Sequence, residues 1–365
     1  MSTHCGEIVD DIIAVACTMG ASDVHFDPFA DGLIVRFRLH GKLIEANRVS
    51  PLLPHVVTNA AVQRLKVLAK LSVGELRKPQ DGQLSLPIRD DSSCDIRIST
   101  MPTVRGERLV ARIIVPENPW DSIASLGLTP YQQEQVQAVL DDQGGMVVIA
   151  GGIGSGKSTT MHAMLLEKSR CGASVLSIED PVERHYEAFS QVQVDEWQGL
   201  TFAQGLRAAL RQDPDVLMVG EIRDEQTAAI AVRAGMTGHL IITSIHADHP
   251  AGVVSRLLDF GVHPHFVEEA LRLIVWQRLR PVACRNCDGK GCSKCYGLGF
   301  CGRKADFQLL TRQAIEPLFF AAQMHMQPLL TRAKEDAFGA VRGEAETARY
   351  GGFSQRFERS FASGN

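Results

Sequence analysis

One segment, residues 147–160 with the sequence VVIAGGIGSGKSTT, combines residue types whose order could bind a polyphosphate. It fits the pattern G-x-x-x-x-G-K-[ST] from Gly151 to Ser158. Glycines let backbone N–H groups approach phosphate oxygens, and a helix starting near Lys157 would add the positive end of its dipole. Lys157 would contact the β and γ phosphates, and the Ser158 hydroxyl would hold Mg²⁺.

This segment therefore predicts a site for ATP and Mg²⁺, and the alternative is a glycine-rich turn that matches the pattern by chance. The residues that we expect to hold the nucleotide are Gly151, Gly152, Ile153, Gly154, Ser155, Gly156, Lys157, Ser158 and Thr159.

Two further segments place acids at the ends of predicted strands, IEDPVE at 178–183 and VLMVGEIRD at 216–224. In the second, Glu221 follows four apolar residues as in a Walker B strand, with Gly220 where many NTPases have Asp. An acid in this place can orient the attacking water. We expect Glu221 to do so, with Glu179 as the second candidate. For either residue the alternative is a solvated acid at a strand-to-turn boundary.

Histidines and arginines are candidates for contacts with the transferred phosphoryl group. His239 begins a predicted strand and His246 lies seven residues later, so only one of them can approach the phosphates. Arg207 and Arg211 are four residues apart and share one helix face. Three more arginines precede the glycine loop: Arg97, Arg108 and Arg112. One well-placed arginine contributes roughly 10³ to 10⁵ in rate, although a solvated surface charge is the alternative for each.

Four cysteines lie in the segment CRNCDGKGCSKCYGLGF at 284–300 and form two C-x-x-C units, each followed by x-G-x-G. Thiolates at this spacing bind one metal from a tight turn, and four of them make a closed tetrahedral site that suits structural zinc. The alternatives are a redox dithiol and plain reduced cysteines. The predicted ligands are Cys284, Cys287, Cys292 and Cys295.

Composition limits the class of protein. A chain of 365 residues and 39.9 kDa with 45% hydrophobic residues is long enough for two domains. It has no run of about 18 apolar residues and no basic N-terminal leader, so we expect a cytoplasmic protein. A net charge of −4 with scattered Lys and Arg argues against direct nucleic-acid binding. Nine cysteines, an odd number, favour metal ligation in a reducing compartment over a disulfide framework.

The elements that must position these residues fall into two parts. Residues 1–115 predict a small α+β domain, with helices at 4–20 and 54–71 and strands at 23–40, 84–86, 93–99 and 108–115. A linker at 116–128 follows. From 129 to 365 we expect a second domain, in which helices at 130–142, 157–170, 201–212 and 224–235 alternate with strands at 146–150, 174–178, 216–220 and 239–244.

This alternation predicts a mostly parallel sheet that binds its ligand at the carboxyl ends of the strands. After the cysteines, FQLL at 307–310 predicts a strand and residues 311–330 have helical spacing. We expect the last fifteen residues to fray.

Several motifs together resemble the secretion ATPase superfamily, which drives type II secretion and type IV pilus assembly. They are ASDVHFDP (21–28), RKPQDGQLSL (77–86), RISTMPTVRGERLVARI (97–113), the glycine loop, IEDPVE (178–183), LRAALRQDPDVLMVGEIRD (206–224) and TGHLIITSIHAD (237–248). The chain is too short for the N-terminal docking domain that many members carry. Its length, its RKPQDG and STMPT wording and its cysteine segment most resemble the ATPase of the competence pseudopilus.

The resemblance implies a RecA-like P-loop NTPase domain, preceded by the small α+β domain and carrying a short Cys₄ insert. It implies an ATP-hydrolysing hexamer that docks on an inner-membrane platform protein and assembles a pilus-like filament from the cytoplasmic face. It also implies that His246 contacts the γ phosphate and that Arg97 and Arg112 reach the nucleotide of an adjoining subunit. Three rivals remain open: a pilus retraction motor, a RecA-type nucleic-acid translocase and a non-hydrolysing scaffold.

Overall fold

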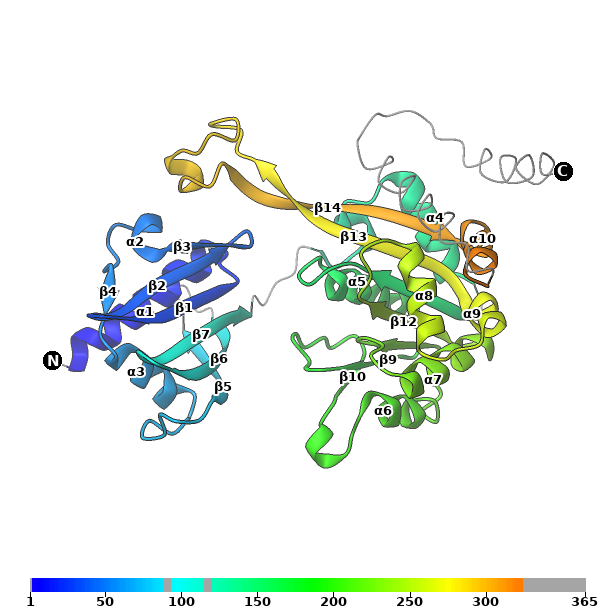
Figure 1. Ribbon diagram of the computed structural model, residues 1–365, viewed down its shortest axis with the longest axis horizontal. Coiled ribbons are helices and arrows are strands. Elements are labelled where there is room, and N and C mark those ends of the chain that lie inside the picture. Colours follow the sequence, from blue (N-terminus) through cyan, green and yellow to red (C-terminus); the bar gives the residue numbers. More distant parts are fainter. Residues whose placement is uncertain (1, 88–92, 115–119, 143, 324–365) are drawn as a thin grey trace.

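The computed structural model describes residues 2–87, 93–114, 120–142 and 144–323. Two sheets, each with its own buried cluster, divide these residues into an N-terminal domain and an ATPase domain (Figure 1). The predicted fold class, a mostly parallel α/β domain preceded by a small α+β domain, is confirmed. In the described part of the chain, no helix has the length and apolarity that crossing a membrane requires.

The N-terminal domain is an antiparallel sheet with helices on one face. Along the sheet the strands run in the order β3 (Lys42–Glu45), β2 (Gly32–Leu39), β1 (Asp23–Phe29), β7 (Gly106–Ile114), β6 (Ser93–Thr103) and β5 (Gln80–Pro87). The short strand β4 (Val56–Val57) pairs with β2. Helices α1 (Ser2–Thr18) and α3 (Ala60–Leu68) contribute Ile12, Ile13 and Leu65 to the core, and α2 (Ala46–Val49) follows β3.

The two faces of this sheet differ because its strands alternate in the usual period of two. In β2, Leu33, Val35, Phe37 and Leu39 are buried, whereas the residues between them point to the other face. That second face is polar and carries ion pairs between neighbouring strands: Arg36 and Arg108 with Asp27, and Arg38 and Arg112 with Asp23.

The ATPase domain has a seven-stranded sheet. Its order is β10 (Ser190–Gln193), β9 (Val175–Glu179), β11 (Val216–Val219), β12 (Leu240–Ile245), β8 (Gly145–Ala150), β13 (Leu271–Ala283) and β14 (Phe300–Thr311). All neighbours are parallel except β13 and β14. The carboxyl ends of β8, β9, β11 and β12 therefore share one edge, where the predicted phosphate loop and both acidic segments lie.

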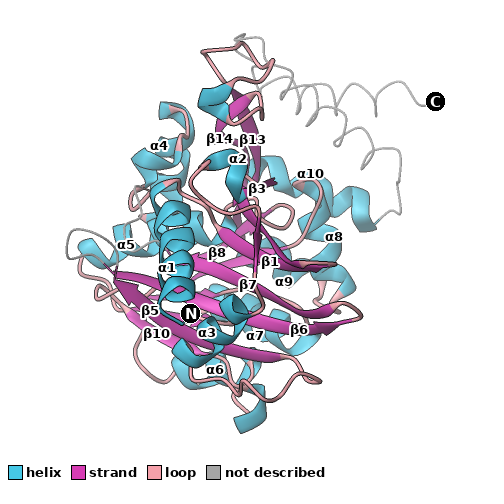
Figure 2. Ribbon diagram, turned by 90° about the vertical axis from the view of Figure 1, so that its left-hand side faces the viewer, coloured by secondary structure: helices cyan, strands magenta, loops and turns pink. Residues whose placement is uncertain are grey.

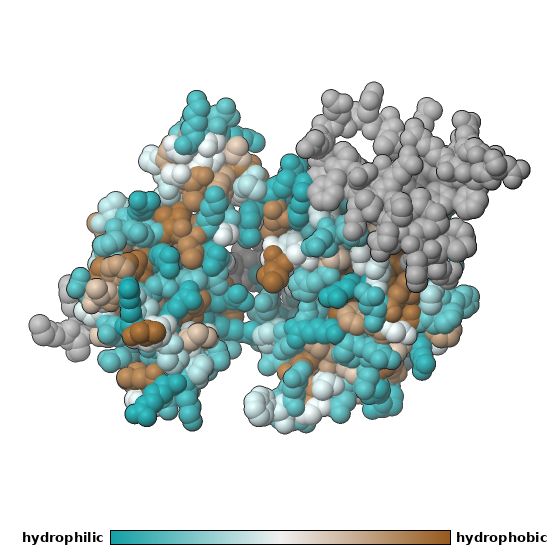
Figure 3. All heavy atoms as spheres, viewed as in Figure 1, coloured by the Kyte–Doolittle hydropathy of each residue, from teal (hydrophilic) through white to brown (hydrophobic). Residues whose placement is uncertain are grey.

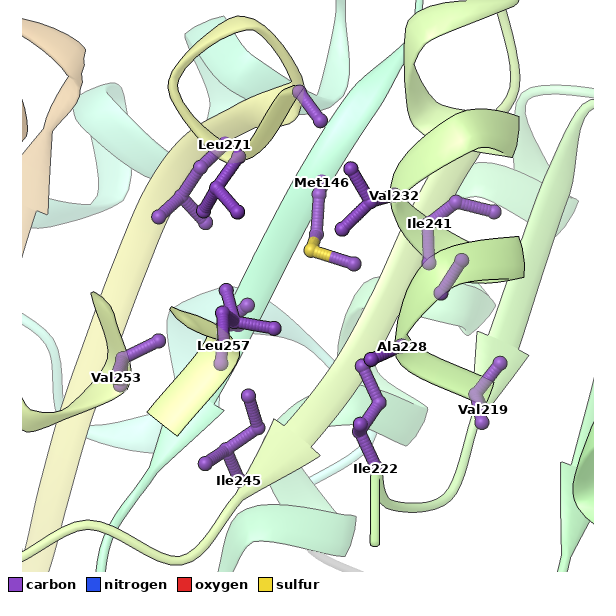
Figure 4. Packing of buried hydrophobic residues seen from close by; sticks show 14 of the residues in the cluster. Met146, Val219, Ile222, Ala228, Val232, Ile241, Ile245, Val253, Leu257 and Leu271 are labelled. Atoms are coloured by element: carbon purple, nitrogen blue, oxygen red, sulfur yellow. The ribbon is translucent and has the colours of Figure 1, made fainter. Parts of the chain in front are cut away.

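Helices cover both faces of this sheet, so the side chains of β8 are buried on both sides of the strand. Met146, Val148 and Ala150 pack with α6 (Phe202–Ala209), α7 (Glu225–Met236), α8 (Ala251–Asp259), α9 (Pro264–Ala270) and α10 (Arg312–Gln323) (Figure 4). Val147 and Ile149 face α4 (Pro130–Leu140) and α5 (Lys157–Arg170) on the other side. A strand with no polar face is what a doubly covered parallel sheet requires.

Strands β13 and β14 continue beyond the sheet as a long two-stranded arm. The arm carries the cysteine segment, including the short turn η3 (Ser293–Cys295), toward the N-terminal domain (Figures 1 and 2). We call residues 284–300 the cysteine knuckle.

Most predicted elements are present, but several boundaries differ. Residues 54–71 do not form one helix, because Val56 and Val57 pair with β2 and α3 begins only at Ala60. Part of the expected linker belongs to the ATPase core: Ile123, Leu126 and Leu128, in and beside η1 (Ile123–Leu126), are buried there. The end of the helix expected at 311–330 and the terminal fifteen residues lie outside the described residues.

Candidate nucleotide site and cysteine centre

The glycine loop connects the central strand β8 to α5, as the sequence predicts. Gly151, Gly154 and Gly156 have φ values of 147°, 69° and 91°, which favour glycine. A Cβ at position 151 would lie 2.3 Å from the Gln277 carbonyl oxygen, so any larger residue would displace the loop. Lys157 Nζ donates to the carbonyl oxygens of Gly151 at 3.1 Å and Gly152 at 3.0 Å. Burial lowers the Lys157 pKa.

The buried residue Gln277, which no sequence motif indicated, supports this loop from the neighbouring strand β13. Gln277 on β13 accepts a hydrogen bond from Thr160 Oγ1 at 2.7 Å and donates one to the Ser155 carbonyl oxygen at 2.7 Å. Its side chain is only 1% exposed. The one hint in the sequence is an amide inside the otherwise apolar run 273–277, LIVWQ. The Ser155 hydroxyl, also buried, has no hydrogen-bond partner among the residues that the structure describes.

Glu221 lies directly after β11, at the edge that carries the glycine loop. His246 Nε2 lies 3.4 Å from one of its carboxylate oxygens, and Arg223 donates to the other. Arg223 also donates to Asp180 at 3.1 Å, which joins both acidic segments. Gly220 stands where many NTPases have Asp, and there is a steric reason for glycine at this position. A Cβ there would lie 3.2 Å from the Ile178 carbonyl oxygen of the neighbouring strand.

The two predicted histidines lie at opposite ends of β12. His246 follows the carboxyl end, and its pKa is lowered by burial and then by the positive charges of Lys157, Arg223 and Arg256, against a hydrogen bond to the Gly151 backbone. These effects favour the neutral imidazole, and the hydrogen bond to Gly151 places the side chain against the loop. His239 precedes the strand, where its Nδ1 lies 3.3 Å from the Ala234 carbonyl oxygen. Six strand residues separate His239 from the loop edge.

Glu179 points into the domain rather than toward solvent. Its carboxylate accepts hydrogen bonds from Ser177 at 2.6 Å and Gln191 at 2.9 Å and lies 3.1 Å from His162 Nε2. The residue is 5% exposed. Burial raises its pKa, but the hydrogen bond and charge of His162 and the other two donors outweigh burial, so the pKa is lowered overall. The adjacent Asp180 is exposed.

The arginines divide by domain. Arg97 donates to the Val182 carbonyl oxygen and Arg112 lies 3.8 Å from Glu183, so both contact the acidic segment of their own chain. Arg108 is held by Asp27 at 2.7 Å within its own sheet. Arg207 and Arg211 are exposed on and just after α6, where Arg211 donates to the Arg207 carbonyl oxygen at 2.7 Å.

The four cysteines of the knuckle converge as a metal centre requires. Their sulfur atoms all lie within 4.8 Å of one another. The Sγ–Sγ distances are 3.9 Å between Cys284 and Cys292, 3.8 Å between Cys287 and Cys295, and 3.7 Å between Cys292 and Cys295. A tetrahedron with zinc–sulfur bonds of about 2.3 Å has sulfurs about 3.8 Å apart. The four sulfurs are therefore close enough to hold one ion despite the short spacer, and the donor set fits zinc.

Backbone and side-chain donors surround these sulfurs. Gly291 N–H donates to Cys287 at 3.2 Å, and Gly299 N–H donates to Cys295 at 3.3 Å. The Asn286 amide donates to Cys292 at 3.4 Å and is the main cause that lowers the Cys292 pKa to about 6. Such donors stabilise thiolates, the form that binds metal.

A parallel sheet with the phosphate loop on its central strand and acids on the neighbouring strand tips is the architecture of P-loop ATPases, and this chain is one. The family model described as "Type II/IV secretion system protein" matches residues 3–353. The chain belongs to that family.

Curated relatives agree with this family. The chain is 35% identical over 368 residues to "Type II secretion system ATPase E" of Vibrio cholerae, an alignment that covers 92% of this chain and 72% of the relative. It is 38% identical over 281 residues to "Type IV pilus assembly ATPase PilB" of Myxococcus xanthus, covering 77% and 49%. For most of the curated relatives, the alignment covers less than two thirds of their length.

Solved structures support the fold. The pilus retraction motor PilT with bound ADP gives a TM-score of 0.63 at 25% identity, with 87% of this chain and 89% of PilT covered. The Legionella pneumophila ATPase DotB gives 0.68 at 21% identity, with 86% of each chain covered.

Proposed function

We propose that this chain is a motor that hydrolyses ATP as a hexameric ring at the cytoplasmic face of the inner membrane and drives assembly of a pilus-like filament. The meeting of Lys157, His246 and Glu221 at the phosphate loop carries the proposal. The names of its relatives support the filament: a type II secretion ATPase and a type IV pilus assembly ATPase. Among such filaments we favour the competence pseudopilus, because of the motif wording and the cysteine segment.

Each group at the loop has a role in hydrolysis. Lys157 and the loop amides from Gly151 to Thr159 bind the phosphates of the substrate. Ser158 would hold Mg²⁺, which supplies charge compensation on the phosphate oxygens when it is bound. Glu221 orients the attacking water and accepts its proton. His246, hydrogen-bonded to the Gly151 backbone of the loop, senses the γ phosphate.

The remaining predicted residues do not contact the phosphates of their own subunit's nucleotide. Glu179, held by three side chains, fixes the strand tip from which Asp180 projects, and we propose it as a positioning residue. His239 has no role at the phosphates, because it lies at the far end of β12. Arg207 and Arg211 are exposed, so they are available to the site of a neighbouring subunit. Arg97 and Arg112 contact Val182 and Glu183 of their own chain, and we propose that they reach the nucleotide of an adjoining subunit when the N-terminal domain rotates.

Hydrolysis measured across a size-fractionated sample tests the proposal. Lys157→Ala should lose binding and turnover, whereas Glu221→Gln should keep nucleotide binding, lower turnover by about 10²- to 10⁴-fold and trap a closed ring. Glu134→Gln, an exposed substitution on α4, is the matched control. Absence of affinity for adenine nucleotides with Mg²⁺ would refute the nucleotide site. Equal turnover per chain in monomer and oligomer fractions would refute a site shared between subunits.

Three rivals make different predictions. A retraction motor of the PilT kind is disfavoured, because the superfamily's retraction motors lack a cysteine segment and this chain has one whose four sulfurs lie within 4.8 Å of one another. A nucleic-acid translocase would hydrolyse ATP faster when DNA is added, and the net charge of −4 argues against it. A scaffold would bind nucleotide without turnover even as an assembled ring.

The docking partner that we propose is an inner-membrane platform protein, which would hold the ring at the membrane peripherally. Co-purification of this chain with a membrane protein of the same machinery, and its loss from the membrane fraction when that protein is deleted, would support this partner. Unchanged membrane association after the deletion would contradict it.

A further inference from the structure

We propose that the cysteine knuckle is a metal-dependent clamp that holds the N-terminal domain of its own chain and links that domain to the strand behind the phosphate loop. The proposal concerns the position of a domain and does not depend on which filament the protein builds. The first observation is that two apolar side chains of the knuckle pack against the core of the N-terminal domain.

Tyr296 and Leu298 pack against the core of the N-terminal domain. Both are partly buried against that core cluster. The Tyr296 hydroxyl donates to Met19 Sδ at 3.6 Å, just beyond the end of α1. In Figure 3, brown hydrophobic atoms lie where the upper part of the molecule meets the N-terminal domain. A knuckle that served only to end the β13–β14 arm would need no such contact.

A second contact lies at the turn between β2 and β3. The ring of Phe300, 8% exposed, is 6.3 Å from the His40 ring in an edge-on arrangement. Lys42 Nζ lies 5.1 Å from the centre of the same ring, within the range of a cation–π interaction. The knuckle therefore contacts two separate elements of the N-terminal domain, which fixes orientation as well as distance.

The cysteines set the direction of these docking side chains. Tyr296 directly follows Cys295 in the left-handed conformation, with φ at 52°. The Leu298 N–H donates to the Cys295 carbonyl oxygen at 2.9 Å, and the Gly297 N–H donates to that of Cys292 at 2.9 Å. A segment this short has too little core of its own to keep this shape without a staple, and metal closure supplies one.

The other end of the arm reaches the nucleotide site. The β13 strand that enters the knuckle at Cys284 also carries Gln277, which holds the phosphate loop through Ser155 and Thr160. Pairing continues without a gap from Leu273 to Pro281, and Asp306 on β14 ties Arg278 and Arg280 together. A shift of the docked knuckle is therefore transmitted along a paired strand to the residue that supports the loop.

Hydrogen exchange of the full chain without nucleotide tests the clamp, read at the amides around Met19 and at the turn His40–Lys42. In the zinc-loaded protein, Tyr296→Ala with Leu298→Ala should raise exchange at both places by about tenfold or more while zinc content stays unchanged. Chelation of zinc from the wild type should do the same. Lys290→Ala, at an exposed knuckle residue, is the control and should change neither.

Unchanged exchange in the zinc-loaded Tyr296→Ala, Leu298→Ala variant would overturn the clamp. Unchanged exchange after chelation, with zinc loss verified by metal analysis, would overturn its dependence on metal. Both measurements omit ATP, so their failure is distinct from failure of the proposed hydrolysis. The melting temperature of each variant shows that it is folded under the conditions of the experiment.

Discussion

Two acids at neighbouring strand tips have very different surroundings. Glu221 faces the groups at the phosphate loop, and its side chain is 18% exposed. Glu179 is enclosed by His162, Ser177 and Gln191. The sequence places both acids at the correct edge of the sheet and favours Glu221, but it does not show that Glu179 is enclosed, because His162 and Gln191 come from other elements.

The surroundings of Glu179 predict a pH-dependent contribution to stability. Its pKa in the folded state lies below the ordinary value of 4.5, so the charged form is stabilised by folding above pH 4.5 and this stability is lost as the pH falls through the folded pKa. Glu179→Gln should therefore be about 1 to 3 kcal/mol less stable than wild type at pH 7. The gap should narrow below pH 4.5.

Thermal unfolding of both proteins at pH 7 and at pH 4 measures this effect. Glu134→Gln at an exposed position should show no such dependence. A gap that is equal at both pH values would contradict the prediction.

The hydrogen bonds of Gln277 predict that this single residue affects ATP affinity. Gln277→Leu would leave the Ser155 carbonyl and the Thr160 hydroxyl without their partner, at about 1 to 3 kcal/mol for each unsatisfied buried group. Because both groups belong to the phosphate loop and its helix, ATP affinity should fall by about tenfold or more. Titration with a fluorescent nucleotide measures the affinity, and Glu134→Gln at an exposed position of α4 is the control. Wild-type affinity in Gln277→Leu would show that the loop does not need this support.

At the scale of elements, the local sequence pattern was sufficient to predict the bounds of a helix or strand wherever that element contains its own motif. Helix α5 begins at Lys157 and ends at Arg170, as predicted, because the glycine loop fixes its start. The pattern failed at Val56 and Val57, where pairing with β2 overrides helical spacing. Gly220 is explained only by the close approach of β9, and no neighbouring residue in the sequence reveals that contact.

The cysteine knuckle predicts a metal content. Purified protein should contain close to one zinc per chain, since the four sulfurs match one tetrahedral centre. Cys287→Ser with Cys292→Ser should lose the zinc, whereas Cys301→Ser, at an exposed free cysteine one residue beyond the knuckle, should retain it. Metal analysis of the three proteins checks this, and a wild-type preparation without bound metal would refute the zinc centre.

At the scale of the whole molecule, the contact between the knuckle and the N-terminal domain could not be predicted from the sequence. Tyr296 and Met19 are 277 residues apart, and the cysteine motif that contains Tyr296 says nothing about a partner near α1. The order of the two domains was predictable, because composition and periodicity change between them. Their contacts depend instead on the length and direction of the arm.

A ring with shared sites predicts complementation between inactive subunits. Lys157→Ala retains the exposed arginines, and Arg207→Ala with Arg211→Ala retains the phosphate loop. Neither variant should hydrolyse ATP well alone, but mixed rings should exceed the sum of the two separate activities. A mixture of Lys157→Ala with Glu221→Gln should show no rescue, because both defects lie in the same subunit's site. The test is the ATP turnover of each co-expressed pair of variants. If the pair of Lys157→Ala with Arg207→Ala, Arg211→Ala showed no gain in turnover, arginines acting between subunits would be contradicted.

The arm of β13 and β14 also constrains how this protein can vary. Side chains alternate along a strand, so one inserted residue between Thr311 and Phe300 would turn Phe300 away from His40 and Lys42. Removing two residues from each strand would preserve the facing but shorten the reach by about 7 Å. The register already shifts once between Pro281 and Ala283, next to the knuckle. In the regular part of the arm, from Leu273 to Pro281, homologous chains that keep the docked knuckle should therefore gain or lose residues two at a time on both strands.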